Sequence, residues 1–230
     1  MDKGNKGSND KSRNRASSFS KTDNNRVTAA ALQVKMGLYD DPLKFADKME
    51  EMVYNASRQG ASLVVFPEDN LSQLLGVLPG LSGDDIEVNA DNQSNPALDG
   101  ILSKLGDEIS ISDILAFIGP FIKKMGLIIF SELASKYKVF IMAGSGLFPD
   151  ENEYMKNGKV LYNKVHTFES NDKKIYNTAY LFDSDGKLLG KQKKNHLLPL
   201  EDRWGLRTGE ELSVYSTDIG RLTFPICMDA

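Results

Sequence analysis

One short stretch decides the fold: residues 62–66 (SLVVF), an almost wholly apolar run. A run of this length and composition is typical of a strand that is buried on both faces. Upstream, residues 42–59 place apolar side chains every three or four positions, which predicts an amphipathic helix that stops near Gly60. Before that helix, residues 27–34 (VTAAALQV) predict a first buried strand. Strand, helix and strand in this order indicate a crossover unit of an α/β fold.

The second half of the chain is richer in strand patterns. A predicted helix over residues 127–137 leads into a predicted strand over 139–143, which the glycines of 144–146 should end. Farther along, residues 176–182 and 187–192 flank an Asp-Gly turn, and this arrangement predicts a β-hairpin. Crossover units followed by hairpins favour a mixed sheet over a fully parallel one.

The long segment 70–126 is harder to interpret. Two short helical patterns follow one another near residues 101–109 and 111–124, with a break expected at Gly119-Pro120. The apolar stretch 109–122 is shorter than the ~20 residues that a membrane-spanning helix needs. We therefore expect a buried or lid-forming helix there, and no membrane partner.

The composition limits the class of protein. A chain of 230 residues suffices for one large domain, and its net charge of −4 gives no basic signature for nucleic acid. One cysteine excludes an internal disulfide, and with only two histidines beside it we expect no metal site. The free thiol fits a cytoplasmic location. Residues 1–25 are polar and should form a disordered tail, which leaves residues 26–230 as the folded domain.

Three reactive side chains lie at the ends of predicted strands. Glu68 and Lys194 each follow a strand, and Cys227 ends the apolar run 222–226, which predicts another buried strand. In layered α/β folds, groups at the ends of neighbouring strands converge on one crevice. A thiol, a carboxylate and an ammonium suit acyl transfer: the thiolate attacks, a neighbouring cation lowers its pKa, the carboxylate moves protons and the ammonium stabilises an oxyanion.

Each of these residues also has a plainer interpretation. A lone cysteine in a strand is usually an inert small hydrophobe, and a glutamate after a proline can be a helix cap or a loop charge. The run Lys191, Lys193 and Lys194 fits a solvated basic edge. A Cys–His dyad with His196 or His166 stays open as well, although His196 fits better a structural role in the loop that carries the lysine.

Three segments carry a resemblance to a known family: residues 63–68 (LVVFPE), 190–197 (GKQKKNHL) and 226–229 (ICMD). Their order and spacing are similar to those of the nitrilase superfamily, the carbon–nitrogen hydrolases, from about residue 26 to the last residue. Residues 176–179 (YNTA) support the match. Within them, Asn177 is expected to be a structural hydrogen-bonding residue near a turn.

The resemblance implies a role for each matching residue. Glu68 matches the family's general base and later acid, Lys194 its lysine, and Cys227 its nucleophile. Glu201 falls where many members have a second glutamate that positions substrate or water. The backbone N–H of Met228 would join Lys194 in an oxyanion hole. The implied reaction is hydrolysis of a non-peptide carbon–nitrogen bond in a small amide or ureido compound, through a cysteine thioester.

The resemblance also implies an αββα four-layer sandwich with a mixed sheet, no cofactor, and a homo-oligomer as one assembly option. Family members usually continue well past the cysteine, so we expect this chain to be an N-terminal portion of the domain, incomplete at its C-terminus. Pro225 departs from the apolar strand residue usual in the family and favours an edge strand or bulge. The competing hypothesis is a truncated, non-catalytic remnant or a binding module of the same family.

Overall fold

The computed structural model describes residues 26–78, 110–150, 154–156, 159–161 and 174–230. The tail 1–25, the helical pattern 101–109 and His166 lie outside them. The elements in chain order are β1 (Ala29–Ala31), α1 (Pro42–Arg58), β2 (Leu63–Val65), the 3₁₀ helix η1 (Asn70–Val77), α3 (Ile111–Tyr137), β3 (Phe140–Pro149), β4 (Tyr154–Lys156), β5 (Lys159–Leu161), β6 (Ile175–Phe182), β7 (Leu188–Lys193), α4 (Pro199–Arg203), β8 (Tyr215–Thr217), β9 (Gly220–Leu222) and the short 3₁₀ turn η2 (Cys227–Asp229).

A mixed five-stranded sheet in the order β1-β2-β3-β6-β7 forms the centre of the fold. β1, β2 and β3 run parallel, whereas β6 is antiparallel to both β3 and β7. The predicted mixed sheet and the hairpin between β6 and β7 are therefore confirmed. Asp183 fixes the hairpin turn, since its carboxylate accepts hydrogen bonds from the backbone N–H groups of Asp185 and Lys187.

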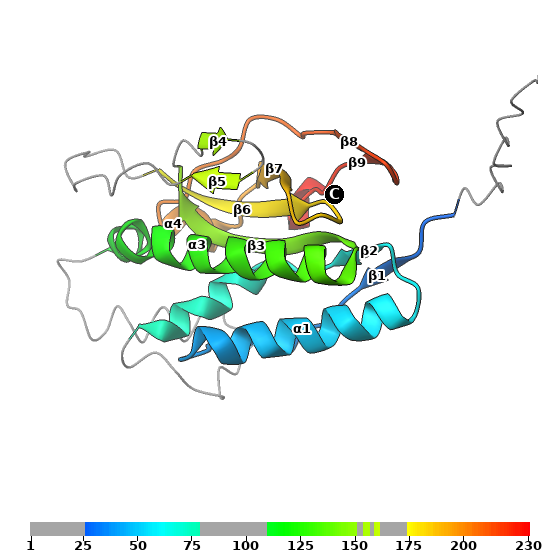
Figure 1. The fold of residues 1–230 in the computed structure, drawn as a ribbon. Helices are drawn as coiled ribbons and strands as arrows, with labels where there is room; N and C mark the ends of the chain where they lie inside the picture. The colour runs from blue at the N-terminus through cyan, green and yellow to red at the C-terminus, as the bar shows by residue number, and fades with distance from the viewer. Residues whose placement is uncertain (1–25, 79–109, 151–153, 157–158, 162–173) are drawn as a thin grey trace, which may run out of the picture.

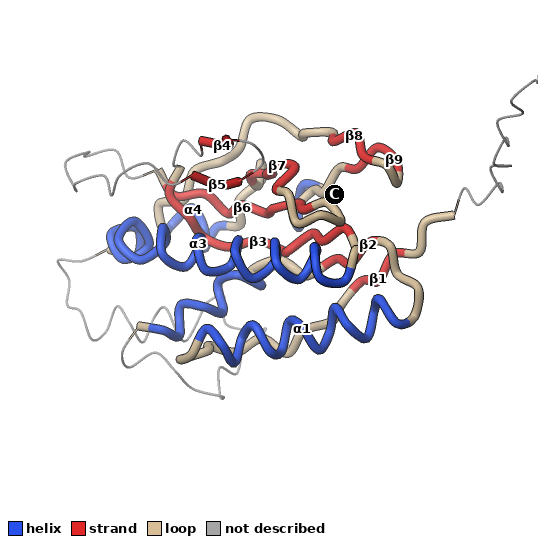
Figure 2. Tube along the Cα trace, in the orientation of Figure 1, coloured by secondary structure: helices blue, strands red, loops and turns tan. Residues whose placement is uncertain are grey.

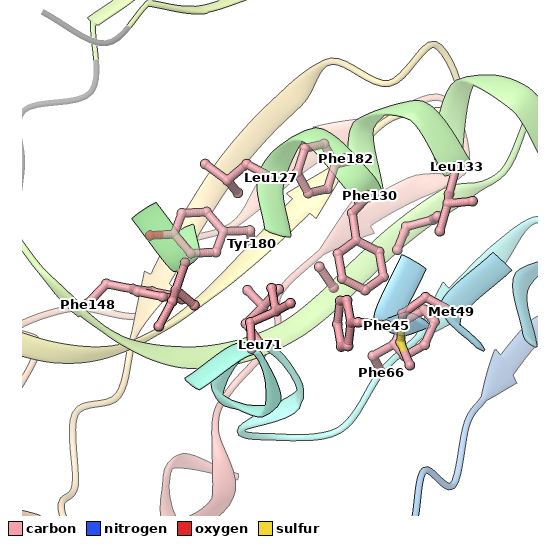
Figure 3. Close-up of a cluster of buried hydrophobic side chains, with 14 of the residues drawn as sticks. Phe45, Met49, Phe66, Leu71, Leu127, Phe130, Leu133, Phe148, Tyr180 and Phe182 are labelled. Atoms are coloured by element: carbon pink, nitrogen blue, oxygen red, sulfur yellow. The ribbon is translucent and has the colours of Figure 1, made fainter. Parts of the chain in front are cut away.

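Helices α1 and α3 cover one face of this sheet, and the last part of the chain lies on the other (Figure 1). The helix-covered face holds the main core, in which Phe130 meets Phe45 and Phe66 edge to face (Figure 3). This arrangement gives a helical layer and a mixed sheet, in agreement with the α/β sandwich expected from the sequence.

The first two strands are less buried than predicted. In β1, Ala30 packs against the core while Ala29 and Ala31 on the opposite face are exposed, because β1 is the edge strand of the sheet. In β2, Val64 is fully buried, but its neighbours on the other face are only half-buried. The prediction of a buried strand is thus wrong for β1, and the prediction of a strand buried on both faces is half right for β2.

The predicted helix break at Gly119-Pro120 is also wrong, because α3 is one continuous helix of 27 residues. A proline inside a helix removes one backbone donor, and packing on β3 outweighs that loss. Gly119 lets the helix approach β3 closely, since a Cβ at this position would lie 2.7 Å from Cδ of Pro149. A capping box between Ser110 and Asp113 secures the first turn.

By length and composition alone, α3 could cross a membrane, with a mean hydropathy of 1.7 over its most apolar window. It is longer than the apolar stretch considered in the sequence. However, Leu115, Ile122 and Phe130 are buried against the sheet and α1, and core helices of soluble proteins pass the same test. Phe117 and Phe121 are exposed.

Strand β3 does not end at the glycines, contrary to the prediction. It continues to Pro149 through a bulge between Met142 and Ser145. Gly144 makes the bulge possible: its φ of +75° is left-handed, and a Cβ there would lie 2.1 Å from the carbonyl oxygen of Pro67. The bulge thus brings β3 directly under the segment that carries Glu68.

The last segment of the chain packs on the sheet face opposite the helices. Phe224 and Ile226 bury themselves against Ala179 and Leu181 of β6, and the ring of Tyr215 stacks on Phe224. Residues 223–226 make no strand; they follow an irregular path between β9 and η2 (Figure 2). The prediction of a strand over 222–226 is therefore wrong, as the proline within it indicated.

Candidate active site

Four polar side chains meet at one edge of the sheet. Glu68 follows β2 and Lys194 follows β7, while Asn177 lies near the start of β6, which runs in the opposite direction. These strand ends therefore share one edge. Glu201 reaches the same place from α4, the short helix after the lysine loop. The predicted convergence of Glu68 and Lys194 is present in the structure, and Glu201, which the family resemblance implied, joins them.

The four side chains form a closed hydrogen-bond network. The ammonium of Lys194 donates to Glu68 Oε1 at 2.9 Å and to Glu201 Oε2 at 2.8 Å. The amide of Asn177 bridges the same two carboxylates, with Nδ2 2.8 Å from Glu68 Oε1 and 3.0 Å from Glu201 Oε1. The backbone N–H of Leu198 adds a bond to Glu201 Oε2. Each carboxylate is thus held by at least two donors.

Lys194 is the fixed positive charge of this network. Its side chain is buried, and burial alone would lower its pKa. Hydrogen bonds to Glu201 and Glu68, and the charges of both, outweigh burial and hold the pKa of Lys194 above its ordinary value. Lys194 is therefore an ammonium ion at neutral pH.

Asn177 is a member of the site that the sequence did not reveal. The sequence suggested a structural role near a turn, but the residue lies inside β6 and is fully buried. Its Oδ1 has no hydrogen-bond partner among the described residues. An asparagine within a largely buried strand was the available signal, because buried polar residues need specific partners.

Cys227 lies beside this network, at the start of η2 rather than at a strand tip. It is exposed, and its φ of 51° is left-handed, a conformation that costs a non-glycine residue about 1–3 kcal/mol. A strained turn of this kind presents a nucleophile away from the backbone. Since such a turn must be held in place, its anchors are part of the site.

The pKa of Cys227 is raised, contrary to the expectation that a cation would lower it. Partial desolvation of the thiol is the main cause, followed by the negative charge of Glu68. Lys194 and the backbone N–H of Met228 act in the opposite direction but are outweighed. At neutral pH the cysteine is therefore a thiol rather than a thiolate.

Asp229 anchors the cysteine turn to the lysine loop. Its carboxylate accepts hydrogen bonds from the backbone N–H of Asn195, at 2.9 and 3.1 Å, and from that of His196 at 2.8 Å. The ring Nδ1 of His196 lies 3.0 Å from the same carboxylate. This contact supports the structural role expected for His196, whose imidazole is otherwise exposed.

Asp69 adds a third carboxyl group next to the network. Its backbone N–H donates to Ser145 Oγ in the β3 bulge, and its Oδ1 accepts from Ser72. Burial, and then the charges of Glu68 and Glu201, raise its pKa from 3.8 to about 7. The sequence gave no reason to select this residue.

Replacing Asp69 by asparagine should remove a pH dependence of stability. A folded-state pKa above the unfolded value means that the folded protein holds the proton more tightly, so stability falls as pH rises from about 4 to 7. One pKa unit corresponds to about 1.4 kcal/mol, so the loss is at most about 4 kcal/mol. Urea denaturation from pH 4 to 8 should show this slope in the wild type and a flatter profile in Asp69→Asn. Equal slopes would contradict the assignment; Asp218→Asn, exposed in the β8–β9 turn, is the control.

Among the described residues, no group of three or more His, Cys, Asp or Glu side chains could hold a metal ion.

Comparison with known proteins identifies the family to which this α/β fold belongs. The carbon–nitrogen hydrolase family model matches residues 28–230. The chain belongs to the carbon–nitrogen hydrolase family.

Individual relatives are distant. A probable hydrolase of Bacillus subtilis, YhcX, is 28% identical over 187 residues, which are 81% of this chain and 26% of that protein. A bifunctional nitrilase/nitrile hydratase of Lupinus angustifolius is 27% identical over 204 residues, which are 88% of this chain and 47% of that protein. The chain thus spans about half the length, or less, of these curated relatives.

Solved structures share the fold. An amidase from Nesterenkonia sp., whose active-site cysteine carries the product of Michael addition of acrylamide, superposes with a TM-score of 0.51 at 18% identity over 88% of this chain and 58% of that chain. Nit3 of Saccharomyces cerevisiae, a nitrilase-superfamily member, gives a TM-score of 0.51 at 22% identity over 88% of this chain and 56% of that chain. These likenesses confirm the predicted fold class.

Proposed function

We propose that this protein hydrolyses a non-peptide carbon–nitrogen bond of a small amide or ureido compound through a thioester on Cys227. The observation that carries the proposal is the meeting of three groups from distant parts of the chain. Glu68 contacts Lys194 directly, and the Glu68 carboxylate also acts on the Cys227 thiol, whose pKa it raises. A base, a cation and a nucleophile at one sheet edge suit acyl transfer.

In the first half of the reaction, Glu68 takes the proton from the Cys227 thiol, and the thiolate attacks the carbonyl carbon. The negative charge that develops on the carbonyl oxygen is stabilised by the ammonium of Lys194 and by the backbone N–H of Met228. The carbon–nitrogen bond then breaks, and Glu68 gives its proton to the departing nitrogen. Ammonia or an amine leaves, and the acyl group stays on sulfur.

In the second half, water attacks the thioester carbon while Glu68 again takes a proton. Collapse of the intermediate breaks the carbon–sulfur bond, releases the carboxylic acid and returns the thiol. Glu201 fits a supporting role, since its Oε2 holds the ammonium of Lys194 and its Oε1 holds Asn177. It keeps the cation in place and helps to position substrate or water.

The substrate class follows from the family, whose members act on small amides. Two of the relatives named above are an amidase and a bifunctional nitrilase/nitrile hydratase. A substrate survey should therefore include primary amides, ureido compounds and nitriles.

Release of ammonia from such a panel tests the proposal. We expect the wild-type protein to release ammonia from at least one amide or ureido compound, and Cys227→Ala to release none above background. Mass spectrometry of the wild type during turnover should show the acyl group on the peptide that contains Cys227. Ser216→Ala, an exposed change in β8, is the matched control and should keep full activity.

Two results would count against the proposal. Ammonia release that persists in Cys227→Ala would exclude the thiol as nucleophile. A folded wild-type protein that releases nothing from the whole panel would favour the alternative, a non-catalytic member of the family.

A further inference from the structure

Asp229 is a buried carboxylate that the reaction described above does not use. Its side chain is 2% exposed, although it lies two residues after an exposed cysteine. Hydrogen bonds from two successive backbone N–H groups, those of Asn195 and His196, converge on it. These donors, with the ring of His196, satisfy a charge that burial would otherwise disfavour, and they hold the pKa of Asp229 below its ordinary value.

The partners of Asp229 join two segments that carry reactive groups. Asn195 directly follows Lys194, and Asp229 is two positions after Cys227. The backbone N–H of Lys194 is in turn bonded to the carbonyl of Asn177, and its carbonyl accepts from Gly209. The lysine loop is therefore fixed to the sheet, and the cysteine turn is fixed to the lysine loop through one carboxylate.

Apart from Asp229, the described contacts that hold the cysteine turn and the residues just before it are the apolar packing of Phe224 and Ile226 on β6 and a few backbone hydrogen bonds. Residues 223–226 make no strand pairing in the described part of the chain, and η2 has only three residues. Within the turn, backbone bonds run from Asp229 to Ile226 and from Ala230 to Cys227. Neither bond reaches the segment of Lys194 or Glu68. The left-handed backbone conformation of Cys227 is intrinsically unfavourable for a residue with a Cβ.

We propose that Asp229 is a positioning residue: its carboxylate clamps the Cys227 turn onto the lysine loop and so sets the distance of the thiol from Glu68 and Lys194. The importance of this clamp for catalysis rests on the proposed function, but the position of the thiol relative to Glu68 and Lys194 can be probed without a substrate. Cys227 is the only cysteine of the chain, so the rate of alkylation of the protein reports on this thiol alone.

The test is the pH profile of alkylation by iodoacetamide in the full chain. Glu68 raises the pKa of the thiol, so a thiol released from its place should titrate closer to a free cysteine. We expect Asp229→Asn to move the profile to lower pH by ~0.5 unit or more. Asp229→Glu, which keeps the charge but lengthens the side chain, should move it in the same direction by less. Asp218→Asn, an exposed change, should leave it unmoved.

A double-mutant cycle makes the test specific. In the wild-type background, Glu68→Gln should shift the alkylation profile, whereas in the Asp229→Asn background the same change should shift it by less than half as much. Once a hydrolysable substrate is known, Asp229→Asn should lower kcat with little change in KM.

The proposal is overturned if Asp229→Asn folds, as judged by circular dichroism, and keeps both the wild-type profile and the full effect of Glu68→Gln. Should Asp229→Asn fail to fold, Asp229→Glu decides in the same way: a moved profile supports the proposal and an unmoved one overturns it. Because the readout is thiol reactivity, an absence of hydrolysis would count against the proposed function and not against this clamp.

Discussion

Lys194→Met should be both much less stable and much less active than the wild type. The substitution keeps most of the side-chain volume but removes the ammonium that joins Glu68 to Glu201. The two carboxylates would then face each other with Asn177 as their shared donor. Removing one partner of a buried ion pair typically costs 3–5 kcal/mol, and because Glu68 is partly exposed we expect about 3 kcal/mol.

Urea denaturation measures the stability loss, and Lys138→Met is the matched control. Lys138 forms an ion pair with Asp185 in which both side chains are mostly exposed, so its loss should change the free energy of unfolding by less than about 1 kcal/mol. Activity of the folded Lys194→Met protein should fall about 10³-fold, because the oxyanion loses its cation. A variant as stable as the Lys138→Met control would mean that the network is not a buried charge pair.

Glu68→Gln should change hydrolysis and thiol reactivity in opposite directions. Hydrolysis should fall about 10²- to 10⁴-fold, since glutamine cannot accept the thiol proton or deliver it to the leaving nitrogen. Alkylation of Cys227 near neutral pH should become faster. Desolvation and the negative charge of Glu68 raise the pKa of the thiol, and Lys194 lowers it, so removing the charge of Glu68 should bring the pKa down.

Measuring both rates on the same preparation separates the proposed role from general damage. A misfolded variant would also lose hydrolysis, but the pKa of its thiol would not be lowered by Lys194. Glu210→Gln, an exposed change in the loop before β8, should alter neither rate. Slower alkylation in Glu68→Gln would show that the carboxylate does not raise the pKa of the thiol, and the base would have to be sought elsewhere.

The sequence correctly predicted elements whose formation depends on a few neighbouring residues. The apolar spacing within α1 and the Asp-Gly turn between β6 and β7 are properties of short segments, and both predictions are confirmed. The break at Pro120 and the end of a strand at Gly144 also followed local rules, and both are wrong. In each case a contact with a distant residue, Pro149 or Pro67, decides the conformation.

The same distinction between local patterns and distant contacts applies to the residues of the site. Glu68, Lys194 and Glu201 were predicted from motifs, and the structure brings them together. Asn177, Asp69 and Asp229 acquire their importance from neighbours far along the chain, which no spacing rule contains. The raised pKa of Cys227 could not be predicted either, because its sign depends on whether burial and Glu68 outweigh Lys194.

The four-residue network also affects how the chain folds during and after its synthesis. The bond from Lys194 to Glu68 spans 126 positions of the chain, and that from Asn177 to Glu68 spans 109. Contacts of such separation require large loops to close and form slowly compared with helices and hairpins. During synthesis Glu68 emerges from the ribosome long before Asn177 and Lys194. The segment of α1 and β2 is therefore present for a time while the carboxylate of Glu68 has neither of these partners. The proposed reaction therefore requires these long-range contacts to form first, because chains without them do not yet hold Glu68, Asn177 and Lys194 together.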